Sequence, residues 1–173
     1  TTIYFKIIYK MAVLMFRPVP VDQEPKLKNR FVLEFPSDIG IESYLVQTAK
    51  RPSMKIEKIT IPYMNSQSYV AGRYYFDEMS ISFIEVLGPS TSQKIMEWVR
   101  LHAEPATGKM GYAVGYKKNL VLKCLDPVGV EVEKWTLVGC QIVSADFDEN
   151  SYAANELLTC TIVIQPDRCF LDA

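Results

Sequence analysis

The stretch that most constrains the fold of this chain is residues 54–85, MKIEKITIPYMNSQSYVAGRYYFDEMSISFIE. Its first part, Met54 to Tyr63, spaces isoleucines with polar residues, and its last part, about Arg73 to Glu85, alternates apolar residues with serines. Apolar residues at every second position indicate half-buried β-strands. The residues between the two parts, 65–72, form a connector that is too long for a two-residue turn. This stretch therefore predicts a long β-hairpin.

Aromatic side chains gather around the far end of the predicted hairpin. Arms that reach beyond one small domain usually bury their surface against another chain, and an ordinary surface loop is the alternative. Tyrosine suits such a contact because its ring is apolar while its hydroxyl finds a polar partner. We predict a subunit interface here, formed by Tyr63, Met64, Asn65, Tyr69, Arg73, Tyr74 and Tyr75.

The rest of the chain predicts one β-rich domain. A length of 173 residues, 49% of them hydrophobic and 23% charged, is enough to bury a core. One amphipathic helix, roughly Thr91 to Ala103, follows Ser90, which with Gln93 forms an S-x-x-Q capping pattern. Gly139 is expected to mark a bulge or a close backbone approach. Further strands are expected at residues 29–35, 44–49, 116–125, 130–144 and 157–165. The predicted fold class is mainly β, an antiparallel β-sandwich or small barrel with one packed α-helix.

Two segments divide the predicted domain organisation. Residues 1–28 are predicted to be an N-terminal extension, and residues 29–173 a single β-domain. Lysines interrupt the apolar run of residues 1–16, no signal-peptide cleavage site follows it, and residues 17–28 are rich in proline and charge. Residues 1–10 could add a strand to their own sheet or to a neighbour's, and the sequence leaves both open. No stretch approaches the length of a transmembrane helix, so we expect no membrane insertion.

Several function classes are disfavoured by composition and motifs. A net charge of −1 argues against a dedicated nucleic-acid binder. The single histidine, His102, and the absence of a CxxC pair argue against a Cys/His zinc site. His102 lies at helical spacing and is interpreted as a helix-end residue. Phosphate-loop, dinucleotide-binding and metalloprotease motifs are absent, and solvated loops explain the acidic pairs. We therefore predict no enzyme, no metal and no cofactor.

Ordered motifs in this chain resemble the tail tube proteins of contractile-tailed bacteriophages. The similarity covers about residues 29–167, while residues 1–28 and the four cysteines depart from the pattern. The matching runs are KIEKITIPYMN and VAGRYYFDEMSISF of the central hairpin, then YKKNLVLKCLDPVG, LVGCQIVSADFD and ELLTCTIVIQPDR of the three closing strands.

The resemblance implies a structural protein, similar in fold to type VI secretion tube proteins. Such subunits assemble with themselves as hexameric rings, stacked into the tail tube of a virion that forms in the host cytoplasm. Strands from each subunit join into one continuous inner barrel, which removes exposed sheet edges. The implied partners are the sheath protein, baseplate and tail terminator proteins, and DNA that passes through the lumen without specific binding.

Three function hypotheses remain open at this point. The first is a tube-forming subunit that serves as the conduit for genome ejection. The second is a tube-initiating baseplate subunit or a tube-terminating subunit of the same fold. The third, from a different class, is a monomeric ligand-binding β-barrel whose helix covers one end.

A tube that passes DNA also predicts the character of its wall. Cationic side chains would bind phosphates and slow the DNA, so channel-facing residues should be neutral or acidic. Lys117, Lys118 and Lys123 should then lie outside or at ring contacts. The predicted lumen candidates are Glu57, Glu85, Glu131 and Glu133.

The four cysteines fall into two groups. Cys124, Cys140 and Cys160 lie on the apolar faces of predicted strands, where free thiols behave as small buried hydrophobes. Cys169 lies beyond the last predicted strand. A virion is an oxidising setting, so Cys169 is the candidate for an inter-chain disulfide.

Overall fold

The computed structural model describes residues 24–153 and 155–172. The chain divides into two compact units, residues 1–30 and 31–173. In the first unit, an ion pair joins Arg30 Nη1 to Glu24 Oε1 at 3.6 Å. The predicted strand-adding arm at residues 1–10 lies outside the described residues, and the separate role of residues 1–28 stays a prediction.

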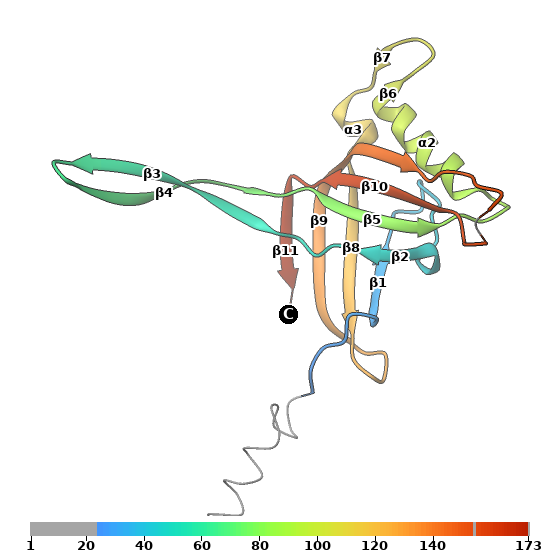
Figure 1. The fold of residues 1–173 in the computed structure, drawn as a ribbon, viewed down its shortest axis with the longest axis horizontal. Coiled ribbons are helices and arrows are strands. Elements are labelled where there is room, and N and C mark those ends of the chain that lie inside the picture. The colour runs from blue at the N-terminus through green and yellow to red at the C-terminus, as the bar shows by residue number, and fades with distance from the viewer. Residues whose placement is uncertain (1–23, 154, 173) are drawn as a thin grey trace, which may run out of the picture. The chain divides into compact units, whose positions relative to one another are not determined.

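The second unit is built on a seven-stranded antiparallel sheet (Figure 1). Its strand order is β1-β8-β9-β10-β5-β2, and β11 pairs with β9 beside this path. In this order β1 and β2 are edge strands, so the described residues form an open sheet and the small-barrel alternative is wrong. The mainly β, antiparallel fold with one packed helix is confirmed. The strands are β1 (Phe31–Glu34), β2 (Val46–Ala49), β5 (Met79–Ile84), β8 (Lys118–Leu125), β9 (Glu131–Phe147), β10 (Thr159–Gln165) and β11 (Arg168–Asp172).

The long strand β9 belongs to both halves of this sheet. Its first part pairs with β8 and β11, and its second part, from Gln141 onward, pairs with β10. In Figure 1, β1, β8 and β11 run up and down the view while β2, β5 and β10 run across it. Sheets that meet at such a corner share a strand that bends. The bend includes Gly139, whose φ is +70° and whose added Cβ would collide with the Asp167 side chain. Lys118 opposes Cys140 but Leu120 opposes Leu137, so β9 contains one more residue than β8 here and the predicted bulge is confirmed.

The hydrophobic core lies between the two halves of the sheet. Alternate residues of the strands point inward, as the period of two requires. Phe83, Ile81 and Ile162 have no exposed surface. Full burial of one such side chain contributes roughly 1.5–3 kcal/mol to stability. Further core members are Leu33, Met79, Leu120, Leu122, Leu137, Ile142 and Ile164.

The helix α2 (Thr91–His102) covers this core with Ile95 and Trp98. Its predicted start is confirmed, because the Ser90 side chain accepts a hydrogen bond from the Gln93 backbone N–H. His102 ends the helix, and its ring stacks on Tyr116 with centroids 4.2 Å apart. None of the helices in residues 24–153 and 155–172 is long and apolar enough to cross a membrane. The short elements are η1 (Ser43–Leu45), β6 (Ala103–Glu104), β7 (Lys109–Met110) and α3 (Ala113–Tyr116).

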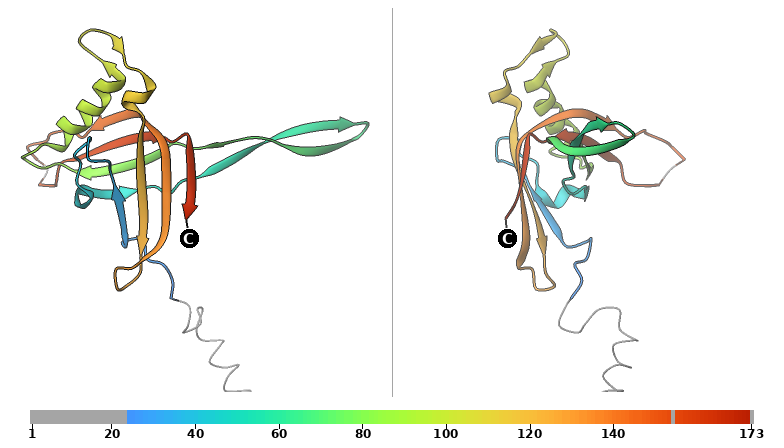
Figure 2. Two further views of the ribbon diagram at one scale, coloured as in Figure 1. Left: turned by 180° about the vertical axis from the view of Figure 1, so that it is seen from behind. Right: turned by 90° about the vertical axis from the view of Figure 1, so that its left-hand side faces the viewer.

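The predicted hairpin is present, but its connector was placed wrongly. The strands β3 (Met54–Tyr63) and β4 (Ser66–Phe76) pair only with each other and project from the main sheet (Figures 1 and 2). The turn consists of Met64 and Asn65, so residues 66–72 are strand rather than loop. Their serines and glutamine resembled a loop because this ladder is exposed on both faces. The return arm ends at Phe76, and β5 is a separate strand.

The sequence analysis also missed the last strand, β11. In this strand Cys169 opposes Leu137 of β9 and packs against the core, so its placement in a free C-terminal tail is wrong. Burial raises the pKa of the Cys169 thiol to about 11. Burial likewise raises the pKa of Cys140 to about 12 and that of Cys160 to about 11. The buried-thiol prediction is confirmed for these two, and Cys124 is half-buried.

Candidate assembly surface

The β3–β4 hairpin exposes large apolar side chains along its whole length. Every residue of β3 is exposed, and in β4 only Gly72 and Phe76 are less exposed than their neighbours. The prediction of a half-buried strand is therefore wrong for the outgoing arm, Met54–Tyr63, in this chain alone, whereas it is confirmed for Met79–Ile84 of the predicted return arm. A two-stranded hairpin without further packing is marginally stable, and monomers rarely leave large apolar patches in water. The exposed set is Met54, Ile56, Ile59, Ile61, Tyr63, Met64, Tyr69, Val70, Tyr74 and Tyr75.

A bulge at Gly72 divides the hairpin into an inner half beside the main sheet and an outer half toward the turn. Ile56 opposes Tyr74 but Lys58 opposes Ala71, so β4 contains one more residue than β3 at this point. A Cβ on Gly72 would lie 3.0 Å from the Glu57 carbonyl oxygen. Glycine therefore permits the close approach of the two strands that the bulge requires.

The apolar side chains change face at this bulge. Opposed residues of a ladder share a face, and successive residues of a strand alternate between faces. The even-numbered residues of β3 are apolar in the inner half, whereas the odd-numbered ones are apolar in the outer half. We call the first set the inner patch: Met54, Ile56 and Tyr74. We call the second set, on the opposite face, the outer patch: Ile59, Ile61, Tyr63 and Val70.

The tip of the hairpin is held by local contacts. Met64 takes a positive φ of 49° at the turn, and the Ser66 hydroxyl donates to the Tyr63 carbonyl at 3.0 Å. The Lys58 ammonium lies 4.9 Å from the centre of the Tyr69 ring, within cation–π range. The structure thus brings all seven predicted interface residues together on one exposed element. The isoleucines and Val70 of the two patches were missed because their alternation was interpreted as packing within the chain.

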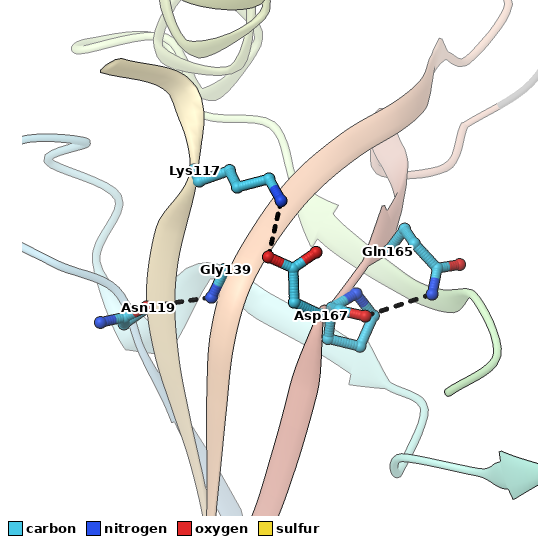
Figure 3. Close-up of polar contacts among 6 residues, drawn as sticks. Lys117, Asn119, Gly139, Gln165 and Asp167 are labelled. Carbon is cyan, nitrogen blue, oxygen red and sulfur yellow. Dashed lines mark hydrogen bonds and ion pairs between the residues drawn. The ribbon is translucent and has the colours of Figure 1, made fainter. Parts of the chain in front are cut away.

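The root of the hairpin is anchored to the main sheet. The Phe76 side chain is buried, and its carbonyl accepts a hydrogen bond from Gln165 Nε2 at 2.6 Å. Gln165 Nε2 also donates to the carbonyl of Pro166 at 3.2 Å (Figure 3). On the other arm, the Asp77 backbone N–H donates to the Ser53 carbonyl at 2.8 Å. These contacts fix the ends of both arms, where β3 follows β2 and β4 leads into β5.

A second polar cluster lies beside this root, where β9 bends (Figure 3). Lys117 Nζ forms an ion pair with Asp167 Oδ2 at 2.6 Å, and Asn119 Oδ1 accepts a hydrogen bond from the Gly139 N–H at 3.0 Å. The Asp167 backbone N–H donates to the Val138 carbonyl at 3.1 Å. The cluster joins β8, β9 and the β10–β11 turn, so it braces the structure on which the hairpin is mounted.

Carboxylates within the chain also pair with the other lysines that were expected away from a lumen. Lys118 pairs with Asp38, and Lys123 Nζ lies 2.8 Å from Glu34 Oε1. Lys123 is also 3.4 Å from Glu131 Oε2. These pairs reduce the cationic character of this face of the sheet, whichever side of an assembly it occupies.

The predicted lumen candidates lie in different environments. Glu133 is only 7% exposed and pairs with Arg51 and the Trp135 indole, so this chain offers little of its surface to a channel, and its lumen role stays a prediction. Its partner Arg51 is distant in sequence. Glu57 and Glu131 are exposed, and their role stays a prediction.

Glu85, the remaining lumen candidate, stabilises the start of α2. Its carboxylate accepts hydrogen bonds from the Ser90 hydroxyl at 2.7 Å and the Ser92 N–H at 3.1 Å. Partial burial by itself would raise the pKa of Glu85, but the hydrogen bonds from Ser92, Ser90 and the helix backbone outweigh burial and lower the pKa. The helix dipole also favours a negatively charged carboxylate at a helix N-terminus. Its lumen role stays a prediction that competes with this capping role.

Two open grooves flank these elements. One, of about 590 Å³, lies at the hairpin root between Lys55, Tyr75 and Gln165. The other, of about 580 Å³, lies between α2 and the end of β9. Among the described residues, no three His, Cys, Asp or Glu side chains are placed to hold a metal ion. Separately, the large apolar side chains exposed on the β3–β4 hairpin suit contact with another macromolecule.

Comparisons with known proteins bear on the fold. Neither models of protein families nor curated protein sequences gave a match. Among solved structures, this chain is similar to the tube terminating cap of the anti-feeding prophage, with a TM-score of 0.72 and 14% identity over 91% of this chain and 96% of that chain. The fold is one found in contractile tube assemblies. The tail-tube-like fold prediction is thereby confirmed.

Two further structures share this contractile-tube fold. One is the PVC sheath/tube terminator in the extended state, with a TM-score of 0.71 and 12% identity over 87% of this chain and 99% of that chain. The other is the PVC sheath-tube complex, with a TM-score of 0.67 and 12% identity over 94% of this chain and 97% of that chain. PVC is described as an extracellular contractile injection system.

Proposed function

We propose that this chain is a structural subunit that assembles with copies of itself into rings, stacked as the inner tube of a contractile tail. The observation that carries the proposal is the exposed hairpin, with apolar patches on opposite faces, in a chain with the contractile-tube fold. A hairpin with an apolar patch on each face has surface for two neighbours. Burial of apolar area at about 25 cal/mol per Å² then stabilises the assembly.

The sheet edges support the same proposal. Within the described residues, β1 and β2 are the two ends of the strand order, and unpaired edges bind other strands unless something covers them. In a closed ring of subunits, edges of neighbouring copies would cover one another. Closed rotational symmetry removes every free edge of this kind at once.

The finer parts of the proposal follow the tail-tube resemblance. We propose hexameric rings surrounded by a sheath, ended by baseplate and terminator proteins, in a virion whose genome leaves through the tube. Glu57 and Glu131 are the proposed acidic residues of the channel wall. A structure of the assembled tube with a net basic wall would contradict that assignment.

A second candidate function is a tube-terminating subunit of the same fold. The likeness to the anti-feeding prophage tube terminating cap, at a TM-score of 0.72, favours it. A terminator would form one ring that ends a tube, whereas a tube subunit would form many stacked rings.

Negative-stain electron microscopy and sedimentation velocity of the purified full chain test both candidates. Stacked rings or tubes are the expected result for a tube subunit. Single rings that do not stack at any concentration would instead favour the terminator. A protein that remains monomeric across the concentration range would overturn the proposed function in both forms.

A further inference from the structure

We propose that the outer half of the hairpin docks, in a second copy of this chain, into the groove between α2 and Phe147 and against the acidic β9–β10 loop beside it. This inference rests on the proposed self-assembly and names the surface that receives the hairpin. Three observations support the inference: the hairpin and the loop have opposite charge, a groove lies beside the loop, and the two surfaces lie at opposite ends of the 31–173 unit.

The donor surface is apolar and carries excess positive charge. Residues 54–76 contain Lys55, Lys58 and Arg73 but only one carboxylate, Glu57. Lys55 pairs with Asp77 at the root, at 2.9 Å. Lys58 lies in the outer half, and Arg73 lies next to the Gly72 bulge at the start of the inner half; both are exposed. The outer patch with Met64 forms the apolar end of the hairpin.

The acceptor surface has the opposite charge. Residues 146–158 contain four carboxylates and no lysine or arginine. One of them, Asp148, already accepts hydrogen bonds from Thr159 and from the Glu149 backbone N–H. Glu149 and Glu156 are exposed in the same loop. Exposed apolar side chains accompany these charges: Phe147, Tyr152, Leu157 and Leu158.

A groove beside this loop gives the acceptor its shape. It has a volume of about 580 Å³ and lies between the outward face of α2, including Met96, and Phe147 at the end of β9. A tyrosine or methionine at the tip of a hairpin can enter such a groove, with its ring or thioether against Met96 and Phe147. Tyr63 and Met64 are the residues that the turn presents there.

The two surfaces lie at opposite ends of the 31–173 unit. The hairpin projects to the left in Figure 1, whereas the β9–β10 loop lies on the right, and the view from behind in Figure 2 agrees. A chain therefore cannot fill its own groove with its own hairpin tip. Donor and acceptor surfaces on opposite ends produce a head-to-tail contact, which repeats into a ring or a filament.

A charge-reversal mixing experiment tests this contact. Variant A carries Lys58→Glu and Arg73→Glu, so its hairpin is acidic. Variant B carries Asp146→Lys, Glu149→Lys and Glu156→Lys, which leaves Asp148 as the one carboxylate of residues 146–158, so its loop is basic. In each variant alone, donor and acceptor carry the same sign and repel each other. In an equimolar mixture, the acidic hairpin of A meets the basic loop of B, and the native hairpin of B meets the native loop of A.

Assembly is measured by sedimentation velocity and negative stain, with circular dichroism confirming that each variant is folded. We expect each variant alone to need about a tenfold higher concentration for assembly than the unmodified chain. The mixture should restore assembly toward that of the unmodified chain. The control variant Lys109→Glu reverses an exposed charge on β7 and should assemble normally.

Each other outcome overturns the inference. If A and B assemble alone as the unmodified chain does, the two surfaces are not in contact. If both folded variants fail and the mixture also fails, the surfaces matter but do not bind each other. In both cases the unmodified chain still assembles, and the proposed function stands. Failure of the unmodified chain itself to assemble would overturn the proposed function, and this inference with it.

Discussion

The main sheet and the β3–β4 hairpin are built from the same alternation of apolar and polar residues but differ in what that alternation buries. In β5 and β10 every second side chain enters the core, and residues such as Ile81 and Ile162 lose all contact with water. In β3 the alternating residues Ile59 and Ile61 both stay exposed. Alternation therefore indicates that one face of a strand is buried against another apolar surface, but it does not indicate whether that surface belongs to the same chain.

The largest expected effect is in the main sheet. Phe83→Ala removes a fully buried ring that lies 5.7 Å from the Phe35 ring. The lost burial and the remaining cavity should lower the free energy of unfolding by about 3–5 kcal/mol. Urea denaturation followed by circular dichroism measures this. A loss below about 1 kcal/mol would mean that the core relaxes around the cavity far more than its packing suggests.

The matching change in the hairpin should leave the fold intact. Ile59→Ser with Ile61→Ser removes the centre of the outer patch, and interface hot spots contribute about 2 kcal/mol or more each. We expect assembly to be lost in sedimentation velocity, while the urea midpoint of the subunit changes little. The control is Thr60→Ser, on the opposite face of the same strand. If the double variant assembles as the unmodified chain does, the hairpin is an ordinary surface loop and not an assembly element.

A Gly→Ala substitution, which adds one methyl group, can be made both in the main sheet and in the hairpin and compares the two regions directly. Gly139→Ala places a Cβ at φ +70° against Asp167 in the bend of β9, and should destabilise the fold by about 1–3 kcal/mol. Gly72→Ala places a Cβ 3.0 Å from the Glu57 carbonyl in the hairpin bulge. Because the nearest atoms to that Cβ belong to Glu57 and Ile59 of the hairpin itself, we expect Gly72→Ala to weaken assembly more than it lowers the thermal midpoint. If both variants lower the thermal midpoint equally, the hairpin contributes to the stability of the fold as the main sheet does, which contradicts the prediction.

The smallest effect concerns Glu85 and pH. Its folded-state pKa lies below the ordinary value of 4.5, so its stabilising contribution is present above that value and is lost as pH falls through the folded pKa. Glu85→Gln should therefore make the free energy of unfolding less steeply dependent on pH below about 4.5, measured by urea titrations at several pH values. The control is Ser68→Ala, an exposed change in the hairpin that removes no titratable group and should leave that slope unchanged.

The sequence was sufficient where a signal is local. The helix start at Ser90 and the strands around Leu33, Leu122 and Ile162 follow from capping and alternation alone, and the structure confirms them. The position of the hairpin turn did not follow from the sequence. Ser66–Ser68 resembled a loop because they are polar residues in a strand that is exposed on both faces.

Features that depend on distant residues could not be predicted in this way. The last strand, β11, is short and follows Pro166, and it exists because β9 offers it a free edge. Glu133 pairs with Arg51, which lies 82 residues away in sequence and which no local pattern connects to it. The change of apolar face depends on Gly72, which as a single letter indicates a turn as readily as a bulge. The exposure of the hairpin tyrosines could be predicted because tyrosines near a turn are a local signal, and their role in an interface stays a prediction.

The pairing of the strands also sets an order in time. In the hairpin, Tyr63 opposes Ser66 and Met54 opposes Phe76, so all its partners are close along the chain. In the main sheet, Phe31 opposes Cys124, and β5 pairs with β10, so both partners come much later in the chain. Short loops close sooner than long ones, and local pairings form in microseconds. During synthesis the pairing partners for the hairpin are therefore complete before those of the sheet that carries it. Its anchor, Gln165, follows Phe76 by 89 residues, so a nascent chain acquires a firmly mounted hairpin only after β10 has been synthesised.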